Sequence, residues 1–135
     1  TTGGSMKKRL KAYQFNNHKM DEAVYAKRRQ VMDIIYELKN LGLNLPRVDV
    51  RIGKDEDCLV LGKARLNDNI IWVTDKAINQ GEEYLRNLVH HELLHAIYGC
   101  QHDESCPIMS ATQSVVVNKN KSIEIFKKYY TKYNK

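Results

Sequence analysis

The sequence has few of the features that mark specialised classes of protein. It contains only three cysteines and no Cys-x-x-Cys pair, so a cysteine-rich structural zinc site is not expected. It has no run of about 18 apolar residues, so no transmembrane helix is predicted. Internal repeats, low-complexity stretches and linkers rich in proline, glycine or serine are also missing. A chain of 135 residues with this pattern predicts one ordinary domain.

The N-terminal residues bear on the limits of that domain and on its location. Residues 1–5 precede Met6 and resemble an expression-tag remnant, so the predicted domain covers residues 6–135. The basic residues after Met6 resemble the start of a secretory signal, but Lys11 and Gln14 interrupt the apolar region that should follow. We therefore expect a cytoplasmic protein, with the compartment unknown if a longer precursor exists. Cys100 and Cys106 could pair in an oxidising compartment, and buried free thiols are expected elsewhere.

The chain carries a formal net charge of +6, from 22 Lys and Arg against 16 Asp and Glu. The basic residues are spread over 7–11, 27–29 and 119–135. A charge of this size favours acidic partners such as nucleic acid, although an ordinary basic surface explains it equally well. Nucleic acid is therefore one predicted partner. No membrane partner is expected, and the chain is predicted to be a monomer.

Hydrophobic periodicity predicts an α+β fold with a small sheet. The predicted elements are a strand at 9–15, an amphipathic helix at 20–41, β-like runs at 47–52, 58–66 and 69–73, a helix from about 81 to 98, and a final helix at 119–133. Asn67-Asp68-Asn69 predicts a tight hairpin between the second and third runs. The segment between the last two helices is expected to be irregular.

The motif His91-Glu92-Leu93-Leu94-His95 lies on the second predicted helix. Residues four apart lie about 40° apart on a helix, so His91 and His95 share one face. Two imidazoles in this arrangement can bind one Zn²⁺ at about 2.0–2.1 Å each. Glu92 projects beside them and is placed to take a proton from water at the metal. The sequence therefore predicts a zinc site with Glu92 as general base.

A catalytic zinc needs a third protein ligand and an open fourth position. Gly99 can end the helix and turn the chain back toward the metal, and His102 follows three residues later. We expect His102 to be this ligand, with Asp103 and Glu104 as alternatives because carboxylates also bind zinc.

The helix that carries the motif is apolar around most of its circumference, which predicts that it is buried. His90 falls in its polar sector near Glu83 and Arg86. We therefore expect His90 to face solvent or to act as a cap.

The motif resembles the metzincin clan of zinc proteases, in particular its small matrixin-like and archaemetzincin-like members. The resemblance covers His-Glu-x-x-His, a glycine turn, a third histidine and a Met-turn at Cys106-Pro-Ile-Met109. It implies a zincin-like domain with a small twisted mixed sheet, a backing helix, an active-site helix and a C-terminal helix. It also implies a zinc-dependent endopeptidase that acts on a protein or peptide substrate, with Met109 as an apolar floor under the metal. In the family the strand before the active-site helix binds extended substrate, which implies roles for Ile70, Ile71 and Trp72.

The sequence departs from the family pattern in two respects. Gly99 and His102 each stand one residue later than in the family, so Gln101 takes the usual position of the third ligand. A one-residue bulge at 98–101 would reconcile the two spacings. The four cysteines that hold a second zinc in archaemetzincins are also missing.

A second resemblance is to SprT-type and Wss-type proteases, which cleave proteins on DNA. It rests on the stretches 61–65, 69–73 and 85–96. The alternatives to a freestanding endopeptidase are therefore a DNA-associated protease and a catalytically silent zinc-binding module that recognises a partner.

Overall fold

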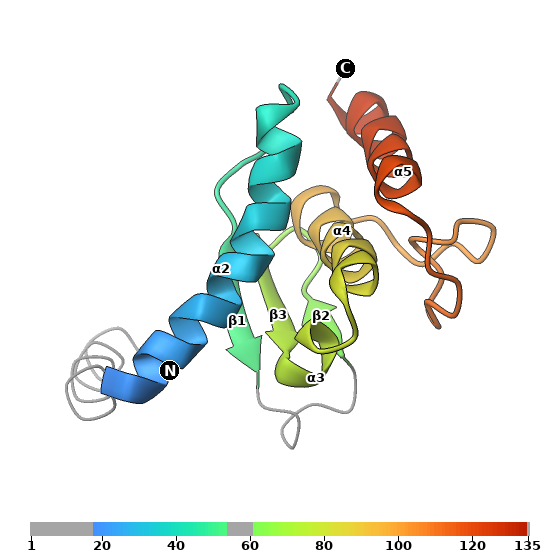
Figure 1. The fold of residues 1–135 in the computed structure, drawn as a ribbon. Helices are drawn as coiled ribbons and strands as arrows, with labels where there is room; N and C mark the ends of the chain where they lie inside the picture. Colours follow the sequence, from blue (N-terminus) through green and yellow to red (C-terminus); the bar gives the residue numbers. More distant parts are fainter. Residues whose placement is uncertain (1–17, 54–60, 135) are drawn as a thin grey trace.

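The computed structural model describes residues 18–53 and 61–134. These residues form an α+β fold in which helices pack on a small three-stranded mixed sheet (Figure 1). The elements in chain order are α2 (His18–Asn40), β1 (Asp49–Gly53), β2 (Gly62–Ala64), β3 (Ile70–Thr74), α3 (Asp75–Ile78), α4 (Glu82–Tyr98) and α5 (Lys119–Tyr133). The predicted α+β class is confirmed.

The sheet has the strand order β1-β3-β2, which places β3 in the middle. β1 runs parallel to β3, whereas β2 is antiparallel to β3. Asn67 and Asn69 in the β2–β3 connection have positive φ angles of 59° and 53°, a conformation that asparagine tolerates better than most residues. The predicted hairpin at 67–69 is therefore confirmed.

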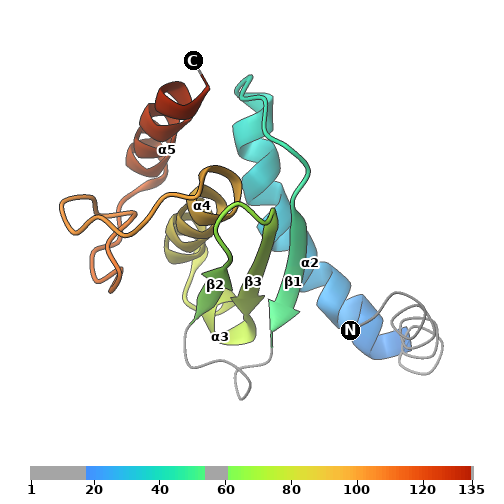
Figure 2. The same cartoon turned by 180° about the vertical axis from the view of Figure 1, so that it is seen from behind.

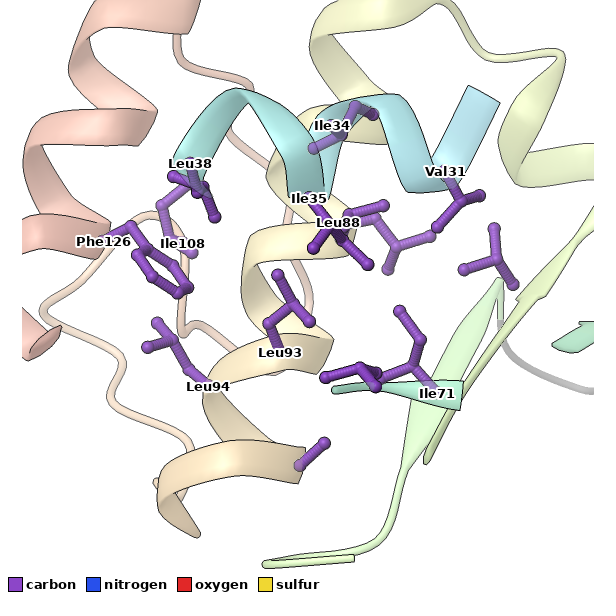
Figure 3. Packing of buried hydrophobic residues seen from close by; sticks show 14 of the residues in the cluster. Val31, Ile34, Ile35, Leu38, Ile71, Leu88, Leu93, Leu94, Ile108 and Phe126 are labelled. Atoms are coloured by element: carbon purple, nitrogen blue, oxygen red, sulfur yellow. The ribbon is translucent and has the colours of Figure 1, made fainter. Parts of the chain in front are cut away.

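Helices α2 and α4 cover one face of the sheet, and Figure 2 shows the opposite face in front of them. The three-to-four spacing predicted for α2 is the reason for its position, since it gathers apolar side chains on one stripe. Figure 3 shows this core, which α2, α4, β3 and α5 all supply. Among the fully or almost fully buried side chains are Val31, Ile35, Leu38, Ile71, Leu88, Leu93, Leu94, Ile108 and Phe126.

The helices agree closely with the sequence, and the strands agree less well. The final helix has the predicted bounds, and α4 begins and ends within a residue of the expected ones. The predicted strand at 58–66 is shorter, because β2 covers only Gly62–Ala64 and residues 54–60 lie outside the described part. The predicted strand at 9–15 also lies outside it. Within residues 18–53 and 61–134, no helix is both long enough and apolar enough to cross a membrane.

Two residues of the polar sector expected on α4, Arg86 and His90, are buried, which corrects the prediction for His90. His90 is completely buried, and its Nδ1 lies 2.6 Å from Ser122 Oγ on α5. Arg86 is also buried, and its guanidinium donates to Glu37 on α2 at 2.9 and 2.7 Å. Both residues meet polar partners far away in the sequence, so they join α4 to its neighbours instead of facing solvent.

Candidate metal centre

His91 and His95 lie one turn apart on α4, as predicted from their spacing. Their Nε2 atoms are 3.1 Å apart, and both residues are buried. The ring centroids are 4.6 Å apart and the rings are nearly perpendicular. Both imidazoles therefore direct one nitrogen to the same point.

The other nitrogen of each ring is fixed by a backbone carbonyl. His91 Nδ1 lies 2.6 Å from the Ile108 oxygen, and His95 Nδ1 lies 2.5 Å from the Cys100 oxygen. A carbonyl oxygen only accepts hydrogen bonds, so each Nδ1 carries the proton and donates it. In the neutral rings both Nε2 atoms then have lone pairs, and these face each other. In metal sites, a hydrogen bond from the ring nitrogen that does not bind the metal to a backbone carbonyl orients the ligating histidine.

Protonation of one Nε2 would turn this contact between lone pairs into a hydrogen bond, but the pKa values of both rings are lowered. Burial lowers the pKa of His91 to about 4, with further lowering from the nearby His95 and His102. Burial also lowers the pKa of His95. At neutral pH two buried lone pairs therefore lie within contact distance. A metal cation between them would satisfy both.

His102 lies beside this pair on the loop that follows α4. Its ring centroid is 5.2 Å from that of His91 and 4.9 Å from that of His95. One possible ligand atom from each of the three residues falls within 4.8 Å of the others, so the three histidines could hold a metal ion. His91 and His95 are buried, whereas His102 is exposed.

The turn at Gly99 brings His102 to this position. Gly99 has a left-handed conformation with φ 66° and ψ 24°, which glycine adopts without a steric penalty. Its N–H donates to the His95 carbonyl at 3.1 Å, and the next N–H, that of Cys100, donates to the Leu94 carbonyl at 3.2 Å. This turn ends α4 and brings the Cys100 carbonyl oxygen within hydrogen-bond distance of His95 Nδ1.

The two alternative third ligands have other partners. Asp103 Oδ1 accepts from the Ser105 N–H at 3.0 Å and from its hydroxyl at 2.6 Å. The Glu104 carboxylate accepts from Ser110 Oγ and from the Ala111 N–H. Both carboxylates hold the loop in shape, and His102 is the loop residue that joins the histidine cluster.

Glu92 is buried beside the two helical histidines and lines the same cleft. A Cβ atom added at Gly62 would lie 3.1 Å from Glu92 Oε2, so β2 passes close to this carboxylate. Burial raises the pKa of Glu92 to about 8. A divalent cation at the histidines would act in the opposite direction. Glu92 is thus poised to exchange a proton near neutral pH.

The histidines and Glu92 open into a cleft of about 490 Å³. Its walls come from β2, from α4 and from the loop after Met109. The lining residues are Leu61, Gly62, Lys63, Ala64, Leu66, Tyr84, His91, Glu92, His95, His102, Ala111, Thr112 and Gln113. Tyr84 and Gln113 were not expected here. Tyr84 lies two turns before His91 on α4, so the helical spacing could have identified it.

Ile70, Ile71 and Trp72, for which the family resemblance implies substrate binding, lie on the central strand of the sheet. These residues form β3, which pairs with a strand on each side, and Ile71 is completely buried. They do not line the cleft. The strand that does so is β2, which has β3 as its only strand partner among the described residues and therefore lies at the edge of the described sheet. The sequence indicates strands but not their order, so it could not show which strand lies along the cleft.

The Met-turn residues pack next to the histidines. Met109 is completely buried, and its carbonyl accepts the Asp103 N–H at 3.0 Å. The preceding residue, Ile108, supplies the carbonyl that orients His91. Cys100 and Cys106, on either side of His102, are free thiols in the structure.

No family model, curated protein or solved structure matches this chain. A functional conclusion therefore depends on the geometry and chemistry of the cleft.

Proposed function

We propose that the protein is a zinc-dependent endopeptidase of zincin-like architecture, as its resemblance to the metzincin clan implies. The observation that carries the proposal is the pair of buried Nε2 atoms, 3.1 Å apart, with both Nδ1 atoms bound to carbonyls. In tetrahedral coordination with bonds of about 2.0–2.1 Å, ligand nitrogens lie roughly 3.3 Å apart. His91 and His95 already have about this separation, and His102 can complete a three-histidine set that leaves one position open.

Zinc held by three protein ligands acts as a Lewis acid and lowers the pKa of water. The remaining chemistry belongs to Glu92. Its carboxylate accepts a proton from the attacking water and later donates it to the leaving amine. Burial in a cleft wall suits the first step, because a carboxylate with a raised pKa is a stronger base, and a pKa of about 8 is close enough to neutrality for the proton to be passed on to the amine.

The position of β2 at the edge of the described sheet supports a polypeptide as substrate. Gly62 and Ala64 line the cleft with small side chains, so an extended chain can approach the backbone closely. An extended peptide that pairs with such an edge gains main-chain hydrogen bonds along its length. This arrangement brings a peptide bond past Glu92, which Gly62 almost contacts.

A silent zinc-binding module would not need a base at this position. Among residues 18–53 and 61–134, Glu92 finds no side-chain hydrogen-bond partner that would give it a structural role, and its burial costs stability. Its position beside the histidines therefore favours catalysis over binding alone.

The experiment is incubation of the zinc-loaded protein with an unfolded protein such as reduced, alkylated lactalbumin, followed by mass spectrometry of the products. We expect internal cleavage that stops with a zinc chelator and returns with added Zn²⁺. A His95→Ala variant should neither bind zinc nor cleave, whereas Lys128→Ala, at an exposed position on α5, should do both. Cleavage that continues in the chelator or in His95→Ala would contradict the proposal.

A further inference from the structure

The face of the sheet opposite helices α2 and α4 carries the only tryptophan of the chain, Trp72, in a row of basic residues. Trp72 on the central strand is in register with Arg51 on β1 and with Lys63 on β2. Register partners point to the same face of a sheet, so all three side chains lie in one row across three strands. This face is the one that Figure 2 presents, opposite helices α2 and α4.

Three cations surround the Trp72 ring. Lys63 Nζ lies 5.2 Å from the ring centroid, and the guanidinium carbons of Arg51 and Arg65 lie at 5.8 and 6.0 Å. Cation–π attraction at an exposed site is worth about 0.5–1 kcal/mol, too little to explain three cations at one ring as a stabilising device. A half-buried indole surrounded by cations is instead suited to a ligand that is both flat and anionic.

Arg51 and Arg65 already pair with carboxylates of the protein, but these ion pairs leave both guanidinium groups available to an incoming anion. Arg51 pairs with Asp49 at 3.0 Å and Arg65 with Asp68 at 3.7 Å. The Arg51 side chain is 47% exposed and that of Arg65 is 77% exposed. Exposed pairs of this kind contribute little, so an incoming anion can replace the carboxylate at low cost.

The basic surface continues in both directions from the row. At one end Lys63 also lines the cleft that holds the histidines. At the other end Arg47, just before β1, lines a groove of about 570 Å³ along α2. Its lining includes further basic and aromatic side chains, namely Tyr25, Arg28, Arg29, Tyr36 and Lys39. Lys39 Nζ lies 5.7 Å from the Tyr36 ring, which repeats the pairing of cation and aromatic ring.

We propose that this face binds single-stranded nucleic acid, with a base stacked on Trp72 and phosphates held by Arg51, Lys63 and Arg65. Single strands are bound by basic tracks that contain aromatic side chains, because every base offers a π-face while the phosphates need cations. An acidic peptide would use the cations but not the indole. A duplex keeps its bases stacked internally, so it would also leave the indole unused. The surface lies outside the histidine cluster and does not depend on hydrolysis.

The test uses the full chain and a fluorescein-labelled oligonucleotide of fifteen thymidines, with anisotropy and Trp72 emission as two readouts. Since Trp72 is the only tryptophan, quenching of its emission reports stacking directly. We expect quenching on binding, an affinity that falls with salt, and weaker binding of the matching duplex. Arg51→Gln/Arg65→Gln should weaken binding on the order of tenfold. The control Lys121→Gln/Lys128→Gln removes the same charge from α5 and should have less than a third of that effect.

Three results would overturn the proposal. Equal losses in the two double variants would mean that net charge alone attracts the strand. Binding without quenching of Trp72 would place the strand elsewhere on the protein. Displacement of the oligonucleotide by poly-glutamate at the same charge concentration, with the same change in emission, would identify the face as a site for acidic protein segments.

Discussion

Replacement of Gly99 by alanine should damage both the fold and the metal centre. Gly99 has φ +66°, and a left-handed alanine costs about 1–2 kcal/mol. The new Cβ would also collide with the side-chain amide of Asn67, and overpacking of this kind costs about 1–3 kcal/mol. We therefore expect Gly99→Ala to lower the free energy of unfolding by about 2–5 kcal/mol.

Gly42 offers a matched control for the backbone contribution. It also has a positive φ, +92°, but a Cβ there would meet nothing within 4 Å. Gly42→Ala should therefore lose only the backbone part, about 1–2 kcal/mol. Urea denaturation of the metal-free proteins would measure both losses as shifts in the midpoint at an unchanged slope.

The substitution also affects zinc binding. Gly99 places the Cys100 carbonyl on His95 Nδ1, and loss of such an outer contact typically costs about 10–100-fold in metal affinity. Competition with a chromophoric chelator should show this loss in Gly99→Ala but not in Gly42→Ala. Adding Asn67→Gly to Gly99→Ala should restore much of the stability, since it removes the colliding amide. If Gly99→Ala matches Gly42→Ala in both assays, the reasoning about this turn is wrong.

Three further predictions concern charge, pH and metal. Glu37→Ala should lower the free energy of unfolding by about 3–5 kcal/mol, because the guanidinium of Arg86, 3% exposed, then loses its main partner. Glu82→Ala, at a side chain 77% exposed, should lower it by less than about 1 kcal/mol. Similar losses for the two variants in urea denaturation would contradict this. Burial lowers the pKa of His90 to about 3, so between about pH 6.5 and 3 this side chain is protonated in the unfolded chain but neutral in the folded protein. The free energy of unfolding should therefore fall as the pH drops through this range. Metal-free His90→Gln should lose about 1.4 kcal/mol less per pH unit than the metal-free wild type over pH 6 to 4, and identical slopes would show that His90 does not titrate in this way. Zinc removal by a chelator should lower the melting temperature of the wild type but leave that of His95→Ala unchanged, as measured by differential scanning calorimetry.

The sequence was sufficient where the determining contacts are local. The spacing of His91 and His95 fixes their common face on any helix, and Asn118 and Gly99 mark where α5 begins and α4 ends. The N-cap Asn118 accepts from the Lys121 N–H at 2.9 Å, which is a short-range signal. For the same reason, the histidine cluster could be predicted from the nineteen residues 91–109.

The rest depends on contacts between residues far apart in the chain. His90 was expected to be exposed, yet Ser122, 32 residues later, satisfies its Nδ1 in the core. Arg86 is buried because Glu37, 49 residues earlier, neutralises it. The edge position of β2 likewise follows from the parallel pairing of β1 with β3. Helical periodicity contains no information about such partners, so the burial of His90 and the strand that lines the cleft could not be predicted from the sequence.

The most direct test of the account is the Glu92→Gln variant loaded with zinc. The amide keeps the shape of the side chain but cannot accept a proton from water, whereas His91, His95 and His102 remain intact. We predict that this variant binds one zinc ion with unchanged affinity and cleaves unfolded protein about 10²–10⁴-fold more slowly than the wild type. Glu83→Gln, an exposed position on the same helix, should cleave at the wild-type rate. Wild-type cleavage by zinc-loaded Glu92→Gln would contradict the proposed role of Glu92 and with it the proposed mechanism.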